Sequence, residues 1–296
     1  MTGPASRPEE VRQLARVARL YYEDGLRQAE IADRLDLSQA TVSRLLKRAV
    51  EQQVVRITVN TPSGYFPELE RGLRDEYGLK DAIVVDHTTD EDRLLRNLGA
   101  GAAYYLETTI KNEDVIGVSS WSETLLATAN AMHPLRTPRG RKVIQIEGGI
   151  GDPSSEAHAS RMTRRLAELC GTEAVMLQAP GVVGSVDTKK ALATDPYFRD
   201  VIHQWDDVTL ALVGIGTPDP SRHLAQSGNA FSEGEQRLLV EAGAVGDINL
   251  HFFDATGQRI ESSLDERVIS MGLDQLRRVQ RCVGIAGGER KWQAIR

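Results

Sequence analysis

Cysteine is scarce in this sequence, which has two cysteines, Cys170 and Cys282, in 296 residues. A single pair cannot form the framework of disulfides that holds small secreted domains together. Each cysteine has an apolar neighbour, Leu169 or Val283, so we expect both to be buried, unreactive thiols.

Long apolar runs are missing as well. No stretch approaches the roughly 18 consecutive apolar residues that a membrane-spanning helix needs. The first residues, MTGPASRPEEVRQ, lack the apolar core of a secretion signal. These absences predict a cytoplasmic protein without a membrane partner.

An overall positive charge is the third absence, because 36 Lys and Arg stand against 42 Asp and Glu. This balance argues against a protein coated uniformly with nucleic-acid-binding charge. Residues 1–60, however, hold 10 basic against 8 acidic residues, and the remaining 236 hold 26 against 34. A small basic head on an acidic body predicts that the head alone meets a polyanion. One solvated helix face would give the same local charge.

Length and composition predict about two ordinary globular domains, because 41% of the 296 residues are apolar and 26% are charged. We place a DNA-binding domain over residues 1–60 and a linker with a helix over 61–78. The second domain then covers residues 79–296.

Apolar residues at three-to-four spacing predict helices over Glu9–Glu23, Gln28–Leu35 and Gln39–Gln52. Alternation over Val54–Val59 predicts a short strand, or wing. The residues expected to face inward from the first helix are Val11, Leu14, Ala15, Ala18 and Tyr22.

The second and third helices have the spacing of a helix-turn-helix, with Ala32 at the crossing and Val42 in the second helix of the motif. Ser38 is a good N-cap, because its hydroxyl can accept from an otherwise unpaired backbone N–H. Glycine is frequent where Asp36 stands, but aspartate also tolerates a left-handed backbone. A plain three-helix bundle is the alternative.

A helix-turn-helix would present small and polar residues to base edges in a major groove and basic residues to phosphates. The predicted DNA-binding residues are Gln28, Ser38, Gln39, Ala40, Thr41, Ser43, Arg44, Lys47 and Arg48.

Short β-branched runs alternate with helical stretches beyond residue 78, which predicts an α/β fold with a doubly wound, mostly parallel sheet. Its binding crevice should lie beyond the carboxyl ends of the strands. The predicted strands are Ala82–Val85, Val115–Val118, Val143–Ile146, Ala174–Leu177, Val208–Val213, Asp247–Phe253 and Cys282–Ala286. The predicted helices are Glu68–Tyr77, Asp92–Thr108, Glu123–Met132, Glu156–Leu169, Tyr197–Trp205 and Glu233–Ala242.

Several turns at strand ends carry groups suited to a small ligand. Hydroxyls in Ser119–Thr124 lie at a helix start, where N–H groups favour an anion, although Ser and Thr also cap helices for structural reasons. Gly148 and Gly149 permit close backbone approach to a ligand, or a tight turn without one. Lys291 follows a Gly-Gly turn and can hold a phosphate as a point charge. Asp247, which is expensive to bury unpaired, can accept from sugar hydroxyls or cap a local turn.

Other constellations are absent from the sequence. The six histidines are scattered without metal-ligand spacing, so we expect no metal and no cofactor. The GIGTPDPSRH segment lacks the end of a nucleotide P-loop, and no G-x-S-x-G elbow occurs.

Several segments together resemble the SorC family of sugar-responsive bacterial transcriptional regulators, over nearly the whole chain. The segments are LYYEDGLRQAEIADRLDLSQATVSRLLKRAVEQQVVRI, GVSSWSETL, QIEGGIGD, GIGTPDPS, GAVGDINLHFFDATG and RVISMGLDQLRRVQRCVGIAGGERKWQAI.

The resemblance implies a domain similar in fold to sugar-phosphate isomerases and deaminases, which binds phosphorylated sugars or related polyols without turning them over. It also implies a homo-oligomer, usually a tetramer. The positions that match the family's effector pocket are Ser119, Ser120, Trp121, Ser122, Glu123, Thr124, Gly148, Gly149, Asp247 and Lys291.

Three positions depart from the family pattern. Many members have glycine at Ser122, a non-acidic residue at Glu123 and a neutral residue at Glu147. Additional carboxylates repel a phosphate, so an unphosphorylated sugar or polyol is an alternative effector.

These observations predict a DNA-binding regulator of a carbohydrate or polyol operon, which binds a pseudo-palindromic operator and a small carbohydrate-derived effector. One alternative is a sugar-phosphate isomerase or deaminase fused to a DNA-binding head, for which Asp247 or Glu123 would serve as the general base. The other is an architectural DNA binder without a ligand.

Overall fold

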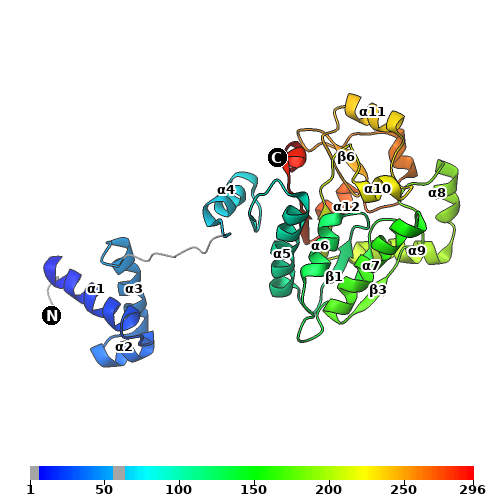
Figure 1. The fold of residues 1–296 in the computed structure, drawn as a ribbon. Coiled ribbons are helices and arrows are strands. Elements are labelled where there is room, and N and C mark those ends of the chain that lie inside the picture. The colour runs from blue at the N-terminus through cyan, green and yellow to red at the C-terminus, as the bar shows by residue number, and fades with distance from the viewer. Residues whose placement is uncertain (1–6, 56–63) are drawn as a thin grey trace. The chain divides into compact units, whose positions relative to one another are not determined.

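The computed structural model describes residues 7–55 and 64–296, and the chain divides between residues 63 and 64 into two compact units. Figure 1 shows the helical N-terminal unit and the α/β C-terminal unit, which we describe separately. No helix in these two described ranges is long and apolar enough to cross a membrane.

Within residues 7–55 the N-terminal unit consists of α1 (Arg7–Tyr22), α2 (Gln28–Leu35) and α3 (Gln39–Glu51), close to the predicted bounds. Leu14, Ile31 and Val42 are completely buried where the three helices meet. The predicted inward face of α1 was partly wrong. Val11 and Tyr22 are 43% and 45% exposed, and Val17 and Leu20 are buried in their place.

The predicted wing over Val54–Val59 falls mostly outside the described residues, which end at 55 in this unit. Val54 and Val55 form a bend and pack against the helical core.

Residues 64–296 contain a parallel sheet of five strands in the order β3-β2-β1-β4-β7. This order makes the boundary between β1 and β4 the switch point of a doubly wound sheet, as predicted. The strands are β1 (Val115–Val118), β2 (Lys142–Gln145), β3 (Glu173–Val175), β4 (Leu210–Gly214) and β7 (Arg281–Ile285).

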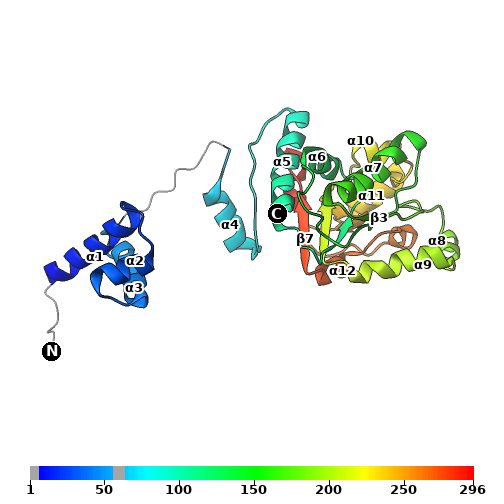
Figure 2. The same cartoon turned by 90° about the horizontal axis from the view of Figure 1, so that it is seen from below.

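Helices cover both faces of the sheet (Figure 2). One face packs against α5 (Glu91–Thr109), α6 (Glu123–Ala131) and α7 (Pro153–Cys170). The other face packs mainly against α9 (Pro196–His203), the 3-10 helix η1 (Gln204–Asp207) and α12 (Leu273–Arg278). The remaining elements are α4 (Pro67–Tyr77), α8 (Val186–Leu192), α10 (Arg222–Gln226), α11 (Glu233–Glu241), η2 (Ser263–Arg267), η3 (Glu289–Lys291) and α13 (Trp292–Ile295).

Two strand predictions were wrong. Ala82–Val85 is an extended segment without strand pairing, and its Val84 N–H donates to the Glu70 carboxylate at 3.0 Å. The run Asp247–Phe253 is an antiparallel hairpin of β5 (Gly246–Ile248) and β6 (His251–Phe253). Asn249 and Leu250 reverse the chain there with left-handed φ values of 54° and 64°, as a two-residue hairpin turn requires.

The prediction for the cysteines was half right. Cys170 at the end of α7 is buried, but Cys282 is exposed. Cys282 lies on β7, an edge strand of the sheet, so no neighbouring strand covers it on that side.

Candidate functional site

The turn between α2 and α3 has the geometry of a helix-turn-helix. Asp36 ends α2 in the left-handed conformation, with φ 54° and ψ 48°, which confirms that aspartate replaces the frequent glycine. The Leu37 N–H then donates to the Ala32 carbonyl at 2.9 Å. Ser38 caps α3 as predicted, because its Oγ accepts from the Thr41 N–H at 3.1 Å. These local bonds fix the angle at which α3 leaves the turn.

One face of α3 is left open by this packing. Val42, Leu45, Leu46 and Ala49 are buried against α1 and α2. The predicted DNA-binding residues Ser38, Gln39, Ala40, Ser43, Arg44, Lys47 and Arg48 are exposed, and Gln28 and Thr41 are half-buried. An exposed helix face that begins with small and polar residues and continues with basic ones suits a major groove.

The basic residues of α3 differ in their partners. Arg48 forms an ion pair with Glu10 of α1, so it helps to hold α1 against α3. Most of the Lys47 side chain is exposed to solvent, and its Nζ lies 3.9 Å from Glu51 Oε1. Arg44 folds back to the Ala40 carbonyl at 3.3 Å and remains exposed. Arg44 and Lys47 are therefore the more available cations for phosphate groups.

A cavity of about 910 Å³ lies at the carboxyl ends of β1, β2, β4 and β7. This is the switch-point crevice where doubly wound domains bind ligands, and its size is within the usual range for small-molecule sites. Its walls also include His87–Thr89, which precede α5, the first residues of α5 at Glu91 and Asp92, and the loop Gly214–Ser221.

Seven of the ten predicted effector residues are among the described residues that line this cavity. They are Ser119, Trp121, Ser122, Glu123, Thr124, Asp247 and Lys291. The turn after β1 places its hydroxyls at the start of α6, where Ser122 Oγ caps the helix by accepting from the Leu125 N–H at 3.3 Å.

The other three predicted residues lie behind the cavity wall. Ser120 Oγ donates to the Glu147 carbonyl at 2.6 Å and so ties the ends of β1 and β2 together. A Cβ on Gly148 would stand 2.2 Å from the Pro180 carbonyl oxygen, so glycine is required there for chain packing. Gly149 forms a bridge with the same segment, at Pro180. We therefore assign Ser120, Gly148 and Gly149 to the support of the site.

Asp247 and Lys291 face the cavity together. Burial raises the pKa of Asp247 to about 6, although the Leu250 N–H and the nearby Lys291 ammonium favour its charged form. Burial lowers the pKa of Lys291, against the attraction of Asp247 and Glu123. Lys291 Nζ donates to the Ile215 carbonyl at 2.8 Å. A Cβ at Gly216 would stand 1.9 Å from the Asp247 carboxylate, so glycine lets the backbone approach this side chain closely.

Glu147 forms part of the cavity floor and is 3% exposed. Burial, with a smaller contribution from neighbouring Asp247, raises the pKa of Glu147 to about 8, against hydrogen bonds from the backbone N–H groups of Ser120 and Trp121 that lower it. The Ser120 N–H donates to Glu147 Oε2 at 3.0 Å. Near pH 7 the carboxyl group is therefore mainly protonated and carries a proton that it can donate.

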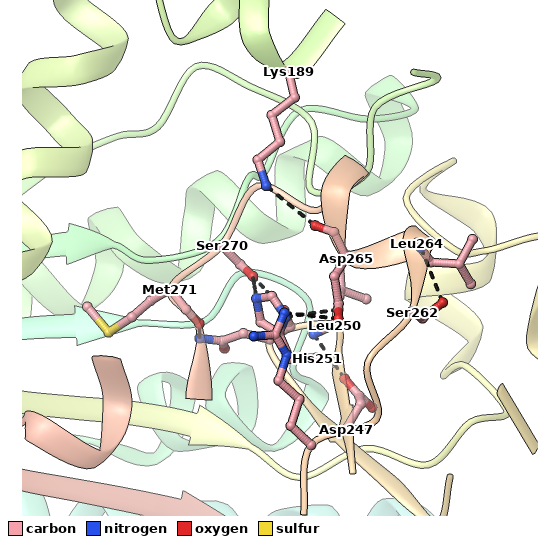
Figure 3. A network of polar contacts seen from close by, with 11 residues as sticks. Lys189, Asp247, Leu250, His251, Ser262, Leu264, Asp265, Ser270 and Met271 are labelled. Carbon is pink, nitrogen blue, oxygen red and sulfur yellow. Dashed lines mark hydrogen bonds and ion pairs between the residues drawn. The ribbon is translucent and has the colours of Figure 1, made fainter. Parts of the chain in front are cut away.

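A polar network joins the β5–β6 hairpin to the segment that contains Asp265 and Ser270 (Figure 3). His251 Nδ1 lies 3.2 Å from Asp265 Oδ1, and His251 Nε2 lies 3.1 Å from Ser270 Oγ. The order Ser–His–Asp resembles a catalytic triad, but the Ser270 hydroxyl donates to the Asn249 carbonyl at 2.6 Å. Its proton is thus engaged with the hairpin turn rather than with the imidazole, which suits a supporting role.

Asn249 and Glu147 are cavity residues that the sequence predictions did not include among the site residues. Asn249 Oδ1 accepts a short hydrogen bond from Ser119 Oγ, and its Nδ2 donates to the Met271 carbonyl at 3.2 Å. The motif GIGTPDPS follows a predicted strand and lines the cavity as well. Because ligands bind beyond the carboxyl ends of parallel strands, the position of this motif after a predicted strand could have identified it as a cavity segment.

Metal ligation has no support in the described part of the chain, where no three His, Cys, Asp or Glu side chains lie close enough to hold an ion. What the cavity presents is a set of hydroxyl, amide and carboxyl groups suited to hydrogen-bonding a polar organic molecule.

Comparisons with known proteins agree with this combination. Residues 65–296 match a family model described as a putative sugar-binding domain, and residues 12–52 match sigma-70, region 4. The deoxyribonucleoside regulator of Bacillus subtilis is 34% identical over 94% of this chain and 88% of its own length. The sorbitol operon regulator of Klebsiella pneumoniae is 29% identical over 97% of this chain and 91% of its own length.

Solved structures show the same similarity. The full-length sorbitol operon regulator SorC from Klebsiella pneumoniae aligns with a TM-score of 0.71 at 28% identity, over 99% of this chain and 92% of that one. A putative sugar-binding domain of the regulator DeoR from Pseudomonas syringae is 37% identical, with a TM-score of 0.58, over 77% of this chain and 87% of that one.

The helix-turn-helix and the switch-point cavity, taken with these matches, define a transcriptional regulator that joins a DNA-binding head to a sugar-binding domain. The chain belongs to the SorC family of such regulators.

Proposed function

We propose that this chain controls an operon for carbohydrate or polyol use by binding operator DNA through α3 and a small effector in the 910 Å³ cavity. The observation that carries this proposal is the pairing of an exposed basic helix with a switch-point cavity lined by hydroxyl, amide and carboxyl groups. The relatives' names, which refer to a sorbitol operon and to deoxyribonucleosides, support a carbohydrate-derived effector.

In the proposed DNA complex, the start of α3 reads base edges. Gln39, Ala40 and Ser43 are exposed there, and Arg44 and Lys47 follow one turn later, where they would reach phosphates. Two such heads in a two-fold assembly, within a cytoplasmic tetramer, would read a pseudo-palindromic operator. Selection from a random duplex library by the full-length protein tests this. We expect inverted half-sites one or more helical turns apart, and a single unrepeated site would contradict a two-fold assembly.

In the proposed effector complex, hydroxyls of the ligand bond to Asp247, to the hydrogen-bonded pair Ser119 and Asn249, and to the α6 start. Lys291 donates to the Ile215 carbonyl and attracts Asp247 electrostatically. The effector acts on DNA binding only if it prefers one conformation or assembly of the regulator over another.

A thermal-shift panel of pentoses, hexoses, polyols and their phosphates tests the effector site. We expect at least one compound to raise the Tm of the wild-type protein, and Asp247→Asn to reduce that shift. A panel without any shift would contradict the proposal and favour a DNA binder without a ligand.

The enzyme alternative has one observation in its favour. Glu147 and Asp247 are two neighbouring carboxyl groups with raised pKa values, as acid–base pairs often are. Glu147, however, accepts two backbone N–H bonds and is directed at the wall. We propose binding without turnover. Product formation from pentose or hexose phosphates by the purified protein would favour the enzyme.

A further inference from the structure

The cavity contains the elements of an anion site, yet each of them already has a protein partner. Such sites are built from turn N–H groups, helix N-termini and basic side chains. In this chain, groups of each kind bond to a carboxyl, carbonyl or hydroxyl group of the protein itself. Whether these N–H groups and basic side chains are free or already bonded decides whether a phosphate group would find a counter-charge in the cavity.

The turn after β1 gives its N–H groups to a side chain. The backbone N–H groups of Ser120 and Trp121 both donate to the Glu147 carboxyl group, the first at 3.0 Å. The Glu147 carboxyl group thus occupies the acceptor position of this turn. An incoming phosphate would have to displace a buried side chain to reach these two donors.

The start of α6 is also occupied. Ser122 Oγ accepts from the Leu125 N–H at 3.3 Å, so one of the helix's first N–H groups is satisfied by the cap. Glu123 stands in the first turn and lines the cavity. A carboxylate there already interacts favourably with the positive end of the helix and would repel a second anion.

Both basic residues among the described cavity residues have acidic neighbours. Arg290 forms an ion pair with Asp219, and Lys291 is attracted by Asp247 and Glu123 and bonded to the Ile215 carbonyl. The described lining also has six acidic residues besides the mainly protonated Glu147, against these two cations and one histidine. They are Glu91, Asp92, Glu123, Asp219, Asp247 and Glu289. The cavity therefore has an excess of negative charge.

We infer that this cavity selects an uncharged, hydroxyl-rich effector and discriminates against its phosphomonoester. The inference rests on the proposed function, because it concerns the same effector site. The ligand's hydroxyls would donate to the carboxylates of Asp247 and Glu123, and hydroxyl groups need no counter-charge.

The experiment measures binding of matched pairs to the full-length protein by calorimetry at pH 7.5. The pairs are a pentose with its 5-phosphate and a hexitol with its 6-phosphate, and inorganic phosphate is a third probe. We expect the free member of a pair to bind at least about tenfold more tightly than its phosphate, because like charges in a binding site are strongly unfavourable. Inorganic phosphate should not compete.

Glu123→Gln sharpens the test, because it removes one carboxylate from the α6 start and leaves the shape of the side chain. We expect it to narrow the preference for the free sugar or polyol by about threefold to tenfold. Glu113→Gln, at an exposed position on the opposite end of β1, is the matched control and should leave the preference unchanged.

The outcomes separate the two hypotheses. Tighter binding of the phosphorylated member to the wild type would overturn the inference and leave the proposed effector function intact. The inference would also fail if Glu123→Gln and Glu113→Gln behaved alike. If no member of either pair bound at all, the effector function assigned to the cavity would itself be contradicted.

Discussion

The two units of this regulator use charged side chains in opposite ways. In the head, Arg44 and Lys47 point from α3 into solvent, and their nearest protein contacts are weak and local. In the sugar-binding domain, Lys291 and Glu147 point inward, and each is bonded to other protein groups. The head therefore has cations available for a polyanion, whereas the cations of the cavity are already engaged by acidic or carbonyl groups of the protein. This contrast shows why residue type alone does not tell which ligand a site takes.

The largest expected effect is on DNA binding. Replacing Arg44 and Lys47 together by Ala should weaken operator binding at least about 100-fold, because each phosphate or base contact contributes about 1–3 kcal/mol. Effector binding should not change. Fluorescence anisotropy with a selected duplex measures the loss. Arg12→Ala with Arg16→Ala, two exposed positions on α1, is the matched control. Equal losses in both double variants would mean that net charge, not the α3 surface, determines binding.

Variants in the head test whether the two units fold independently. Leu14 is completely buried in the helical core, whereas Val11 on the same helix is 43% exposed. Leu14→Ala should destabilise the head by about 2–5 kcal/mol, as truncations in cores do, and Val11→Ala by much less. Circular dichroism measures the unfolding of the variants, and a ligand-binding assay reports on the sugar-binding domain. Loss of effector binding in Leu14→Ala would contradict separate folding.

The sequence predicted the head well because its signals are local. The Ser38 cap and the spacing of Ala32 and Val42 depend on neighbours within a few residues. The inward face of α1 was partly wrong, since both Val11 and Val17 fit a helical period and only the packing against α3 decides between them.

Predictions for the second domain failed where partners come from far along the chain. The segment Ala82–Val85 looks like a strand, but its Val84 N–H finds the Glu70 carboxylate instead of a neighbouring strand. Asn249 carries no local sign of a reversal, because hairpin turns of this kind usually have glycine after it, and here Leu250 follows. The role of Glu147 was also hidden, since its donors belong to a turn 27 residues earlier.

A pH experiment distinguishes the buried charges of the cavity from the exposed ones of the head. The pKa of Glu147 is raised to about 8, so the folded protein holds a proton that the unfolded chain loses above about pH 4.5. This group therefore makes wild-type stability fall as pH rises between these values. Glu147→Gln lacks that loss, so its stability relative to wild type should increase by roughly 1–3 kcal/mol between pH 5 and 7. Denaturant unfolding at each pH measures the difference.

The pH experiment needs a control variant at a carboxyl group that is exposed in the folded protein. Glu113→Gln, at an exposed position, should show a pH-independent difference from wild type. A constant difference for Glu147→Gln as well would mean that Glu147 is ionised in the folded protein, contrary to the burial described.

The smallest expected effect concerns the turn of the helix-turn-helix. Ser38→Ala removes the acceptor of the Thr41 N–H and should cost about 1 kcal/mol of head stability. Ser43→Ala, one turn further along α3, removes a hydroxyl without a capping role and should be close to neutral. Thermal unfolding followed by helical circular dichroism compares the two variants. If Ser38→Ala left the thermal stability unchanged, the Ser38 cap would not stabilise α3.

The central claim is that occupation of the acidic cavity changes how tightly the basic head binds DNA. The direct measurement is operator affinity of the full-length protein with and without a compound that shifts its Tm, in wild type and in Asp247→Asn. We predict a change of about 5–150-fold in the wild-type Kd, the usual range of coupling between two sites, and a much smaller change in the variant. An operator Kd that stays the same when the wild-type cavity is saturated would contradict the account.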